Sequence, residues 1–425
     1  MRILVLGGGG REHAVAWKLR QSPRVTEVFC APGNAGIARD ASCIPADLTN
    51  IDELVQLAHK LEPHLTIVGP EMPLSLGVVD EFERRGLAVF GPSRKAAHLE
   101  ASKAFAKEFM QRVNIPTAHY AICRTSAEVQ EALALFNTPV VVKADGLAAG
   151  KGVVIAETKE EASRVAGQML SRKLVGDAGS KVVLEEFLEG EELSFLVMTD
   201  GTTIVPLLPS RDHKRANDGD TGPNTGGMGA YSSDDLLSST MREWIVNHIA
   251  RPVVNGLRAE GVTYKGVLYI GLMMTARGPM VLEFNCRFGD PETQALMFRL
   301  ESDFFDACEA VAKGALSEDL LRWSSEPSVC VVVASGGYPG AFTNGQVISG
   351  LEEAARLPNA KVFHAGTGNV GNNIVTMGGR VLGVTARGPD LATATARAYD
   401  AVRKIRFEGM QYRRDIATAA VGSRS

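Results

Sequence analysis

The sequence predicts an α/β fold that begins with a parallel β-sheet. Short apolar runs alternate with helical segments in the N-terminal part of the chain, which is typical of βαβ units. The expected strands are residues 3–6, 25–30, 65–68 and 88–90, and the expected helices are residues 14–19, 51–60 and 74–85. The length agrees with this fold class, because 425 residues that are 45% hydrophobic and 22% charged suffice for a globular protein of three or four structural units.

Three turns follow the expected N-terminal strands, at residues 7–13, 32–34 and 69–71. Binding sites in parallel sheets lie at this end of the strands. The first turn holds consecutive glycines and leads into a helix, where free backbone N–H groups and the helix dipole favour a phosphate. A purely structural tight turn is the alternative. A dinucleotide site is disfavoured, because Glu12 replaces the third glycine of G-x-G-x-x-G and no acidic residue ends the second strand.

The chain changes character after a polar helix expected over residues 93–105. A strand at 140–145 carries Lys143, a glycine-rich loop covers 146–152, and a returning strand at 153–155 precedes a helix at 159–169 and a strand at 182–188. A lysine on a buried strand needs a partner for its charge, and phosphate oxygens are one such partner. This pattern indicates a nucleotide site covered by a mobile glycine loop.

Residues 210–229 are too polar and too rich in glycine to form a regular element. A loop of this length inside a compact domain is usually functional or disordered. The density of Asp212, His213, Lys214 and Arg215 after an apolar strand favours a functional loop, and a surface insertion is the alternative. From residue 327 onward, strands at 329–334, 361–367 and 380–385 with a helix at 391–405 predict a small α/β cap.

Residues 283–292 predict a strand with one polar face. Alternation places Glu283, Asn285 and Arg287 on that face, and Leu282, Phe284 and Cys286 on the other. Carboxylate and amide oxygens two residues apart suit Mg²⁺ bridged to phosphates, and the arginine suits an anionic group. The alternative is an edge strand with a solvated polar face. The preceding apolar strand and the abrupt Gly289-Asp290-Pro291 stop favour a metal and phosphate site.

Charge and cysteine usage exclude several classes of partner. A formal net charge of −4 gives no reason to expect nucleic acid or an anionic membrane. The six cysteines are far apart, with no C-x-x-C pair and no zinc-like spacing, so reduced thiols are expected. No apolar stretch approaches the ~20 residues of a membrane span. The sequence therefore predicts a cytoplasmic protein, which we also expect to be a monomer.

These segments, in this order, resemble the ATP-grasp ligases, and within them the phosphoribosylamine–glycine ligase family. The resemblance rests on residues 9–13, 31–36, 68–71, 143–152, 212–215, 220–231 and 283–292. It implies an N-terminal phosphoribosylamine-binding (pre-ATP-grasp) α/β domain over 1–101 and a two-part ATP-grasp domain over 102–326. The latter would comprise a nucleotide lid subdomain (115–190) and a catalytic subdomain (191–326), followed by a C-terminal cap (327–425) with no second catalytic module.

The resemblance also implies a reaction of purine biosynthesis. ATP, glycine and 5-phospho-β-D-ribosylamine would give the glycinamide ribonucleotide, ADP and phosphate through a glycyl phosphate. No side-chain nucleophile is required, and catalysis would depend on positioning and charge stabilisation.

Carried over position by position, the resemblance assigns a role to each motif. Lys103 and Lys143 would contact the nucleotide phosphates; Glu185, Phe187 and Leu188 the adenine; Glu192 the ribose; and Glu283 and Asn285 Mg²⁺ or Mn²⁺. Asp212 and Arg287 would hold the ammonium and carboxylate of glycine, and with Lys143 form the catalytic set. Gly9, Gly10, Arg11, Glu12, His13, Pro32, Gly33 and Asn34 would bind phosphoribosylamine.

Three other functions compete with this hypothesis. A carboxylase-like relative acting on another purine intermediate would differ in the loop at 212–229. An NAD-dependent oxidoreductase is disfavoured by the missing third glycine and by the strand that carries Lys143. A regulatory protein that has lost catalysis is disfavoured by the intact Glu283, Asn285 and Arg287.

Overall fold

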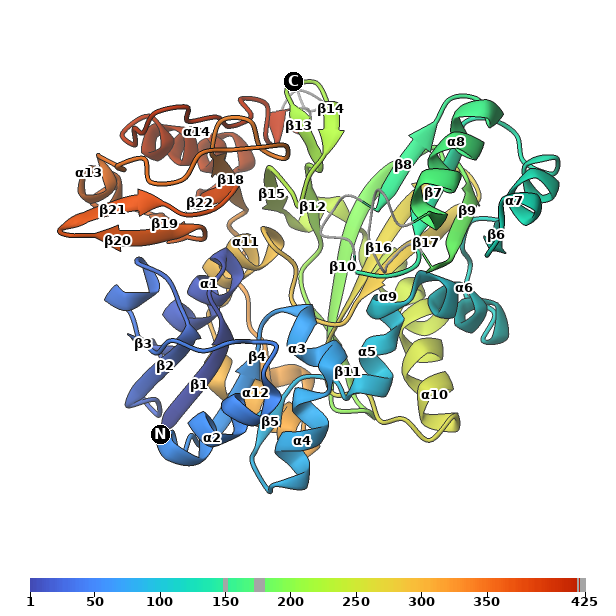
Figure 1. Ribbon diagram of the computed structural model, residues 1–425. Helices are drawn as coiled ribbons and strands as arrows, with labels where there is room; N and C mark the ends of the chain where they lie inside the picture. The colour runs from blue at the N-terminus through green and yellow to red at the C-terminus, as the bar shows by residue number, and fades with distance from the viewer. Residues whose placement is uncertain (148–151, 172–179, 419, 421–425) are drawn as a thin grey trace.

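The computed structural model describes residues 1–147, 152–171, 180–418 and 420. Its N-terminal unit is a five-stranded parallel sheet in the order β3-β2-β1-β4-β5, which confirms the sequence prediction (Figure 1). The strands are β1 (Arg2–Gly7), β2 (Glu27–Pro32), β3 (Ser42–Cys43), β4 (Leu65–Val68) and β5 (Val89–Phe90). The helices are α1 (Gly10–Leu19), α2 (Ile51–Leu61), α3 (Glu71–Leu76) and α4 (Val78–Arg84). The single helix expected over 74–85 is wrong, because Gly77 with φ of +91° separates α3 from α4.

The polar helix expected over residues 93–105 is also two helices, α5 (Arg94–Ala101) and α6 (Lys103–Arg112). Ser102 between them is extended, and its hydroxyl accepts a hydrogen bond from the Phe105 N–H, so it caps α6. Asp145 reinforces this start: it accepts from the Ser102 hydroxyl at 2.9 Å and from the Ala104 N–H at 2.7 Å. The break places Lys103 in the first turn of a new helix.

A small antiparallel sheet follows, in the order β6-β9-β7-β8. It is built from β6 (Tyr120–Cys123), β7 (Val140–Ala144), β8 (Val153–Ala156) and β9 (Val182–Glu186). Helices α7 (Ser126–Leu133) and α8 (Lys159–Leu170) share one hydrophobic core with it. The glycine loop predicted to cover a nucleotide spans 146–152, and residues 148–151 of it lie outside the described residues.

A nine-stranded sheet runs through the rest of the molecule in the order β17-β16-β10-β12-β15-β18-β22-β19, with β11 also pairing with β10. Its strands are β10 (Glu191–Thr199), β11 (Ile204–Pro206), β12 (Ser210–Asp212), β15 (Gly229–Ser232), β16 (Gly266–Thr275), β17 (Gly278–Asn285), β18 (Ser328–Ala334), β19 (Ala360–His364) and β22 (Arg380–Arg387). The C-terminal unit therefore continues the central sheet, because β15 pairs with β18.

The prediction that residues 210–229 form no regular element is wrong. Besides β12 and β15, they form a hairpin of β13 (Arg215–Asn217) and β14 (Thr221–Asn224). Gly219 and Asp220 turn the hairpin with positive φ angles of +69° and +53°. The C-terminal segment holds it in place, since Arg413 donates to Asp220 at 2.6 Å. The polarity of the segment hid these strands, and the Arg413 contact that supports the hairpin comes from 193 residues further along the chain.

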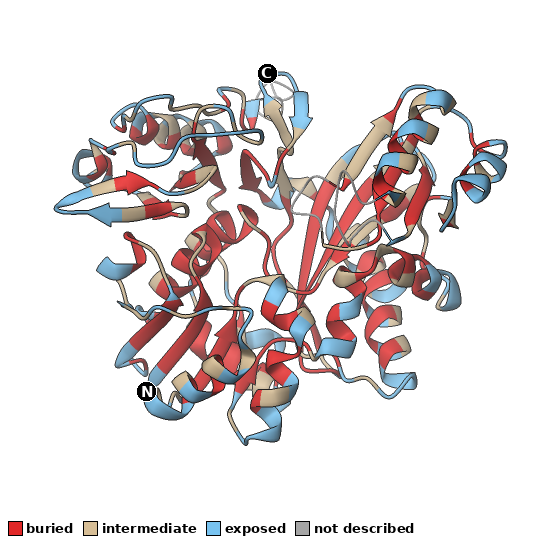
Figure 2. Ribbon diagram, viewed as in Figure 1, coloured by how far each residue is buried: buried red, intermediate tan, exposed pale blue. Residues whose placement is uncertain are grey.

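The remaining helices cover the sheets. They are α9 (Ser239–Ile245), α10 (Arg251–Ala259), α11 (Glu292–Arg299), α12 (Phe304–Lys313), α13 (Leu351–Ala355) and α14 (Leu391–Val402), and β20 (Thr367–Val370) pairs with β21 (Asn373–Thr376). Buried residues follow the sheet strands and the inner helix faces, while exposed residues lie on the outer helices (Figure 2). Among the described residues, no helix has both the length and the apolar character that crossing a bilayer requires.

Candidate active site

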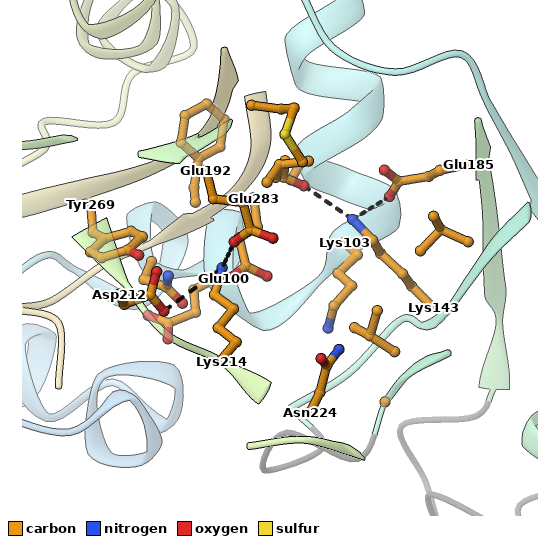
Figure 3. A pocket seen from close by; sticks show the side chains of 18 of the residues that line it. Glu100, Lys103, Lys143, Glu185, Glu192, Asp212, Lys214, Asn224, Tyr269 and Glu283 are labelled. Carbon is orange, nitrogen blue, oxygen red and sulfur yellow. Dashed lines mark hydrogen bonds and ion pairs between the residues drawn. The ribbon is translucent and has the colours of Figure 1, made fainter. Parts of the chain in front are cut away.

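A cavity of about 350 Å³ lies where the small sheet, α6 and the large sheet meet. Polar side chains from all three line it, together with residues of the hairpin segment (Figure 3). The predicted residues that line it are Lys103, Lys143, Glu185, Phe187, Leu188, Glu192, Asp212, Glu283, Asn285 and Arg287. The fold thus brings together ten residues that were predicted to act on nucleotide, metal and glycine.

Two lysines share one carboxylate at the small-sheet side of the cavity. Glu185 on β9 lies 2.9 Å from the Lys143 ammonium and 2.8 Å from that of Lys107. Burial raises the pKa of Glu185, but the two ammonium groups outweigh burial and hold the pKa below its ordinary value. Burial lowers the pKa of Lys107 to about 8. The two lysines and Glu185 together carry a net charge of about +1. This charge suits a polyphosphate.

Lys103 adds a further cation from the first turn of α6. Its ammonium donates to the Gly146 carbonyl at 3.3 Å and has no ion-pair partner within the described part of the chain. Burial lowers the pKa of Lys103, while the nearby Glu283 opposes this shift. Its neighbour Lys107 was missed, although the spacing from Lys103 could have indicated it, because residues four apart share one helix face.

Glu283 and Asn285 both reach the cavity from β17, as the alternation predicts. Burial raises the pKa of Glu283, but Lys214, Lys143 and Lys103 keep it below its usual value, so this carboxylate is ionised. It makes no direct hydrogen bond or ion pair within residues 1–147, 152–171, 180–418 and 420. An ionised carboxylate beside an amide oxygen, facing lysines across a cavity, fits a hard divalent cation bridged to phosphates. Figure 3 shows Glu283 with Lys214 and Asp212 on one side, and Lys143 with Glu185 on the other.

Arg287 lies just beyond the strand, because β17 ends at Asn285 and not at the expected later position. Its guanidinium lies 2.9 Å from Glu100 and 3.3 Å from Glu71, and it donates to the side-chain amide oxygen (Oδ1) of Asn285 at 3.3 Å. The nearby Glu100 carboxylate counters the burial of Arg287 and helps to raise its pKa above the ordinary value. These contacts hold the guanidinium beside the Glu283–Asn285 pair.

Asp212 and Glu192 flank Lys214, whose ammonium lies 4.0 Å from Asp212 and 2.7 Å from Glu192. Burial raises the pKa of Asp212 to about 7; Lys214 opposes this shift and Glu292 adds to it. Glu292 accepts hydrogen bonds from Tyr269 at 3.0 Å and from Ser194 at 3.2 Å. Lys214 and Glu292 were missed as site residues, although both lie inside motifs singled out from the sequence.

The predicted phosphoribosylamine residues lie outside this cavity, at the end of β1 and β2. Three of their side chains are engaged within the protein. Glu12 accepts from the Gly9 N–H at 2.6 Å, Arg11 donates to the Phe288 carbonyl at 3.0 Å, and His13 lies 3.0 Å from Asp40.

On the neighbouring turn, the Asn34 amide donates to the Gly8 and His364 carbonyls at 2.9 and 2.8 Å. Pro32 is exposed, while Gly33 lies against Cys43. Gly10 is buried beside Gln294, so the turn packs on α11. The Arg11, Glu12, His13 and Asn34 side chains of the two turns are therefore engaged within the protein.

This combination defines the class of protein. A small antiparallel sheet and a large sheet enclose lysines and a carboxylate–amide pair, next to an N-terminal parallel sheet, and this is the architecture of an ATP-grasp enzyme. The chain belongs to the phosphoribosylglycinamide synthetase family. Its N-domain model matches residues 1–100, its ATP-grasp (A) domain model residues 101–293 and its C-domain model residues 328–419. The domain limits inferred from the sequence, at 101/102 and 326/327, stay predictions.

Individual relatives agree with the family. The chain is 51% identical to phosphoribosylamine–glycine ligase of Pseudomonas aeruginosa over 99% of this chain and 98% of that protein. It is 49% identical to the enzyme of the same name from Vibrio cholerae, over 99% of each. A crystal structure of phosphoribosylamine–glycine ligase from Thermotoga maritima superposes with a TM-score of 0.86 at 35% identity, covering 98% of this chain and all of that one.

The fold extends to more distant proteins. A biotin carboxylase domain of Hydrogenobacter thermophilus 2-oxoglutarate carboxylase has a TM-score of 0.74 at 18% identity, over 96% of this chain and 91% of that one. At this identity the likeness concerns the fold alone.

Proposed function

We propose that the cavity joins glycine to 5-phospho-β-D-ribosylamine with ATP, the ligation for which the chain's relatives are named. A glycine carboxylate oxygen attacks the γ-phosphorus, and ADP leaves. The amine nitrogen of phosphoribosylamine then attacks the carbonyl carbon of glycyl phosphate; phosphate leaves and the nitrogen loses a proton. The products are the glycinamide ribonucleotide, ADP and phosphate, as in purine biosynthesis. Both steps need charge compensation and orientation more than a protein nucleophile.

One observation carries the assignment of roles: an ionised Glu283 and the amide of Asn285 face three lysines across one cavity. We assign Lys103 and Lys143 to the phosphates and the Glu283–Asn285 pair to Mg²⁺ or Mn²⁺. Bound there, the cation would neutralise charge on the phosphoryl oxygens during transfer.

The nucleotide base and sugar are assigned to the small-sheet side. Phe187 and Leu188 line the cavity there, and Leu188 is buried. We propose that their backbone meets the adenine, with Glu185 close by, and that Glu192 meets the ribose. Binding of ATP would then require Lys214 to share Glu192 with the sugar, since these two side chains form an ion pair at 2.7 Å.

Glycine is assigned to Asp212 and Arg287, with the ammonium on the carboxylate and the carboxylate on the guanidinium. Phosphoribosylamine is assigned to the glycine turn at Gly8–His13 and the turn at Pro32–Asn34, where the dipole at the N-terminus of α1 favours its phosphate. Asp290 connects the two regions, because it lines the cavity and also accepts from the Arg11 N–H at 3.2 Å. We further propose that the protein acts as a cytoplasmic monomer on these small molecules.

A coupled assay of ADP release tests the proposal. With Mg²⁺ and ATP present, we expect release only when both glycine and freshly generated phosphoribosylamine are added. Replacing them with bicarbonate and an aminoimidazole ribonucleotide tests the carboxylase-like alternative. ADP release with the second pair and not the first would overturn the proposed function.

A further inference from the structure

One guanidinium from the C-terminal unit holds two segments that border the cavity. Arg380, at the start of β22, donates to the Gly226 carbonyl at 2.6 Å and to the Asp290 carbonyl at 2.7 Å, with the Gly227 carbonyl at 3.4 Å. Tyr338, from the same unit, accepts from the Gly226 N–H at 3.0 Å. Gly226 and Asp290 both line the cavity. Arg380 itself is outside the cavity lining and lies about ninety residues or more along the chain from the motifs that it contacts.

The two held segments touch each other. Gly227 has a φ of +112°, and a Cβ added there would lie 2.6 Å from the Pro291 ring. The loop therefore packs against the Asp290–Pro291 turn through a position that only glycine fits. Three carbonyl oxygens point toward one guanidinium, so its loss would leave them without a donor and facing one another. All three contacts are made by the same nitrogen, Nη1. A lysine would keep a positive charge, but its compact ammonium on a different stem would not reproduce this placement.

Asp290 extends this arrangement to the N-terminal unit. Its carboxylate accepts from the Arg11 N–H at 3.2 Å and from the Gln294 amide at 2.9 Å, and it lies 3.6 Å from Arg380. Burial raises the pKa of Asp290, but Arg380 and Arg11 outweigh burial and lower it. The Asp290 carboxylate thus joins three parts of the molecule: the start of α1, the segment that follows β17 and the C-terminal unit.

We infer that Arg380 is a positioning residue for the ligation. It fixes the loop at residues 225–227 and the Asp290–Pro291 turn. The part of the cavity assigned to glycine and the glycine turn at Gly9–Arg11 therefore keep one relative placement. This inference rests on the proposed function. It gives the C-terminal unit a part in the reaction, although that unit supplies no side chain to the cavity lining among the described residues.

ATP binding should not depend on Arg380, because the lysines assigned to the ATP phosphates lie on α6 and the small sheet. For Arg380→Met we expect kcat to fall about tenfold or more and the KM for phosphoribosylamine to rise, with the KM for ATP within about twofold of the wild type. Arg380→Lys should recover only a small part of the rate. Tyr338→Phe removes one hydrogen bond to the same loop, so it should change the same parameters in the same direction by a smaller factor.

The matched control is Arg387→Met on the same strand, because Arg387 pairs with Glu326 at 3.3 Å, away from the cavity. We expect it to leave kinetics unchanged. Thermal melting of every variant, with and without ATP, separates positioning from unfolding. Added guanidinium ion should restore part of the rate of Arg380→Ala and none of that of Glu283→Gln.

The decisive comparison is between substrates. The inference would be overturned if Arg380→Met kept the wild-type kcat. It would also be overturned if the variant raised the KM values of ATP and phosphoribosylamine by the same factor. If the wild-type enzyme itself releases no ADP with glycine and phosphoribosylamine, the proposed function fails instead.

Discussion

Two polar regions of this molecule look alike in sequence and differ in what their side chains do. In the central cavity, Glu283 and Lys103 line the space, and neither forms an ion pair within the described part of the chain. In the N-terminal turn, Arg11, Glu12 and His13 are buried and bonded within the protein. A charged motif next to a glycine turn is therefore not by itself a ligand site: the side chains of the first region line a cavity, whereas those of the second are bonded within the protein, as are the Gly9 and Arg11 N–H groups.

The sharpest test of the cavity is Glu283→Gln. The neutral amide keeps the shape but loses the charge that a metal bridged to phosphates requires, so we expect kcat to fall by at least about a hundredfold with the fold intact. Steady-state turnover at saturating Mg²⁺ measures it. Glu353→Gln, the same change on an exposed helix, is the control and should be silent. An unchanged rate in Glu283→Gln would remove the metal assignment and with it the contrast between the two regions.

Asp212→Asn tests whether the cavity carboxylates divide the substrates between them. Loss of a charge-assisted hydrogen bond to the glycine ammonium should cost about 1.5–3 kcal/mol, a rise in the KM for glycine of about 10- to 100-fold. The KM for ATP should stay nearly constant. Varying each substrate in turn decides the matter, and a variant impaired for ATP but normal for glycine would contradict the role of Asp212.

The same residue predicts a pH dependence. With its pKa raised to about 7, Asp212 is ionised only above that pH, so kcat/KM for glycine should rise with pH up to about 7 and then level off. Asp212→Asn should flatten this limb. The effect of pH on stability runs in the opposite direction. Because the native state binds this proton more tightly than the unfolded state does, Asp212 contributes its full stabilisation below the ordinary pKa of 3.8. That stabilisation is lost as pH rises through about 7. Ligand-free Asp212→Asn should therefore melt no lower than the wild type at pH 8, and a lower melting temperature would contradict this account.

Sequence reasoning reached the cavity where local rules apply. Strand alternation placed Glu283 and Asn285 on one face, and Lys143 was found because a buried strand ends in a charge. It missed Lys107, because the helix that aligns Lys103 with Lys107 begins only after the break at Ser102. Sequence alone could not reveal that Arg380 supports the cavity, since its contacts to Gly226 and Asp290 cross 154 and 90 residues. Long-range packing, not local pattern, decides those positions.

Sequence reasoning was limited in the same way at the N-terminal turn. The variant Glu12→Gln measures the consequence. The Glu12 carboxylate accepts from the Gly9 N–H at 2.6 Å and from Arg11 at 2.5 Å, and a Cβ on Gly69 would lie 2.1 Å from it, so it fills the space between the ends of β1 and β4. The glutamine retains one acceptor oxygen and loses the charge that pairs with Arg11. We therefore expect a loss of about 1–3 kcal/mol in the free energy of unfolding, seen in denaturant titration.

The kinetic effect of Glu12→Gln should be the smallest of these, because a side chain that is 2% exposed cannot contact phosphoribosylamine directly. The KM for phosphoribosylamine should change by less than about threefold, through small shifts of the Gly9 N–H alone. Glu83→Gln, at an exposed position on α4, is the matched control for the loss of a carboxylate and should change neither quantity. The contrast between the two regions breaks if Glu12→Gln leaves stability intact but raises that KM tenfold. Such a result would mean that Glu12 leaves its buried site and binds the substrate, and the turn would then belong with the cavity as a set of acting side chains.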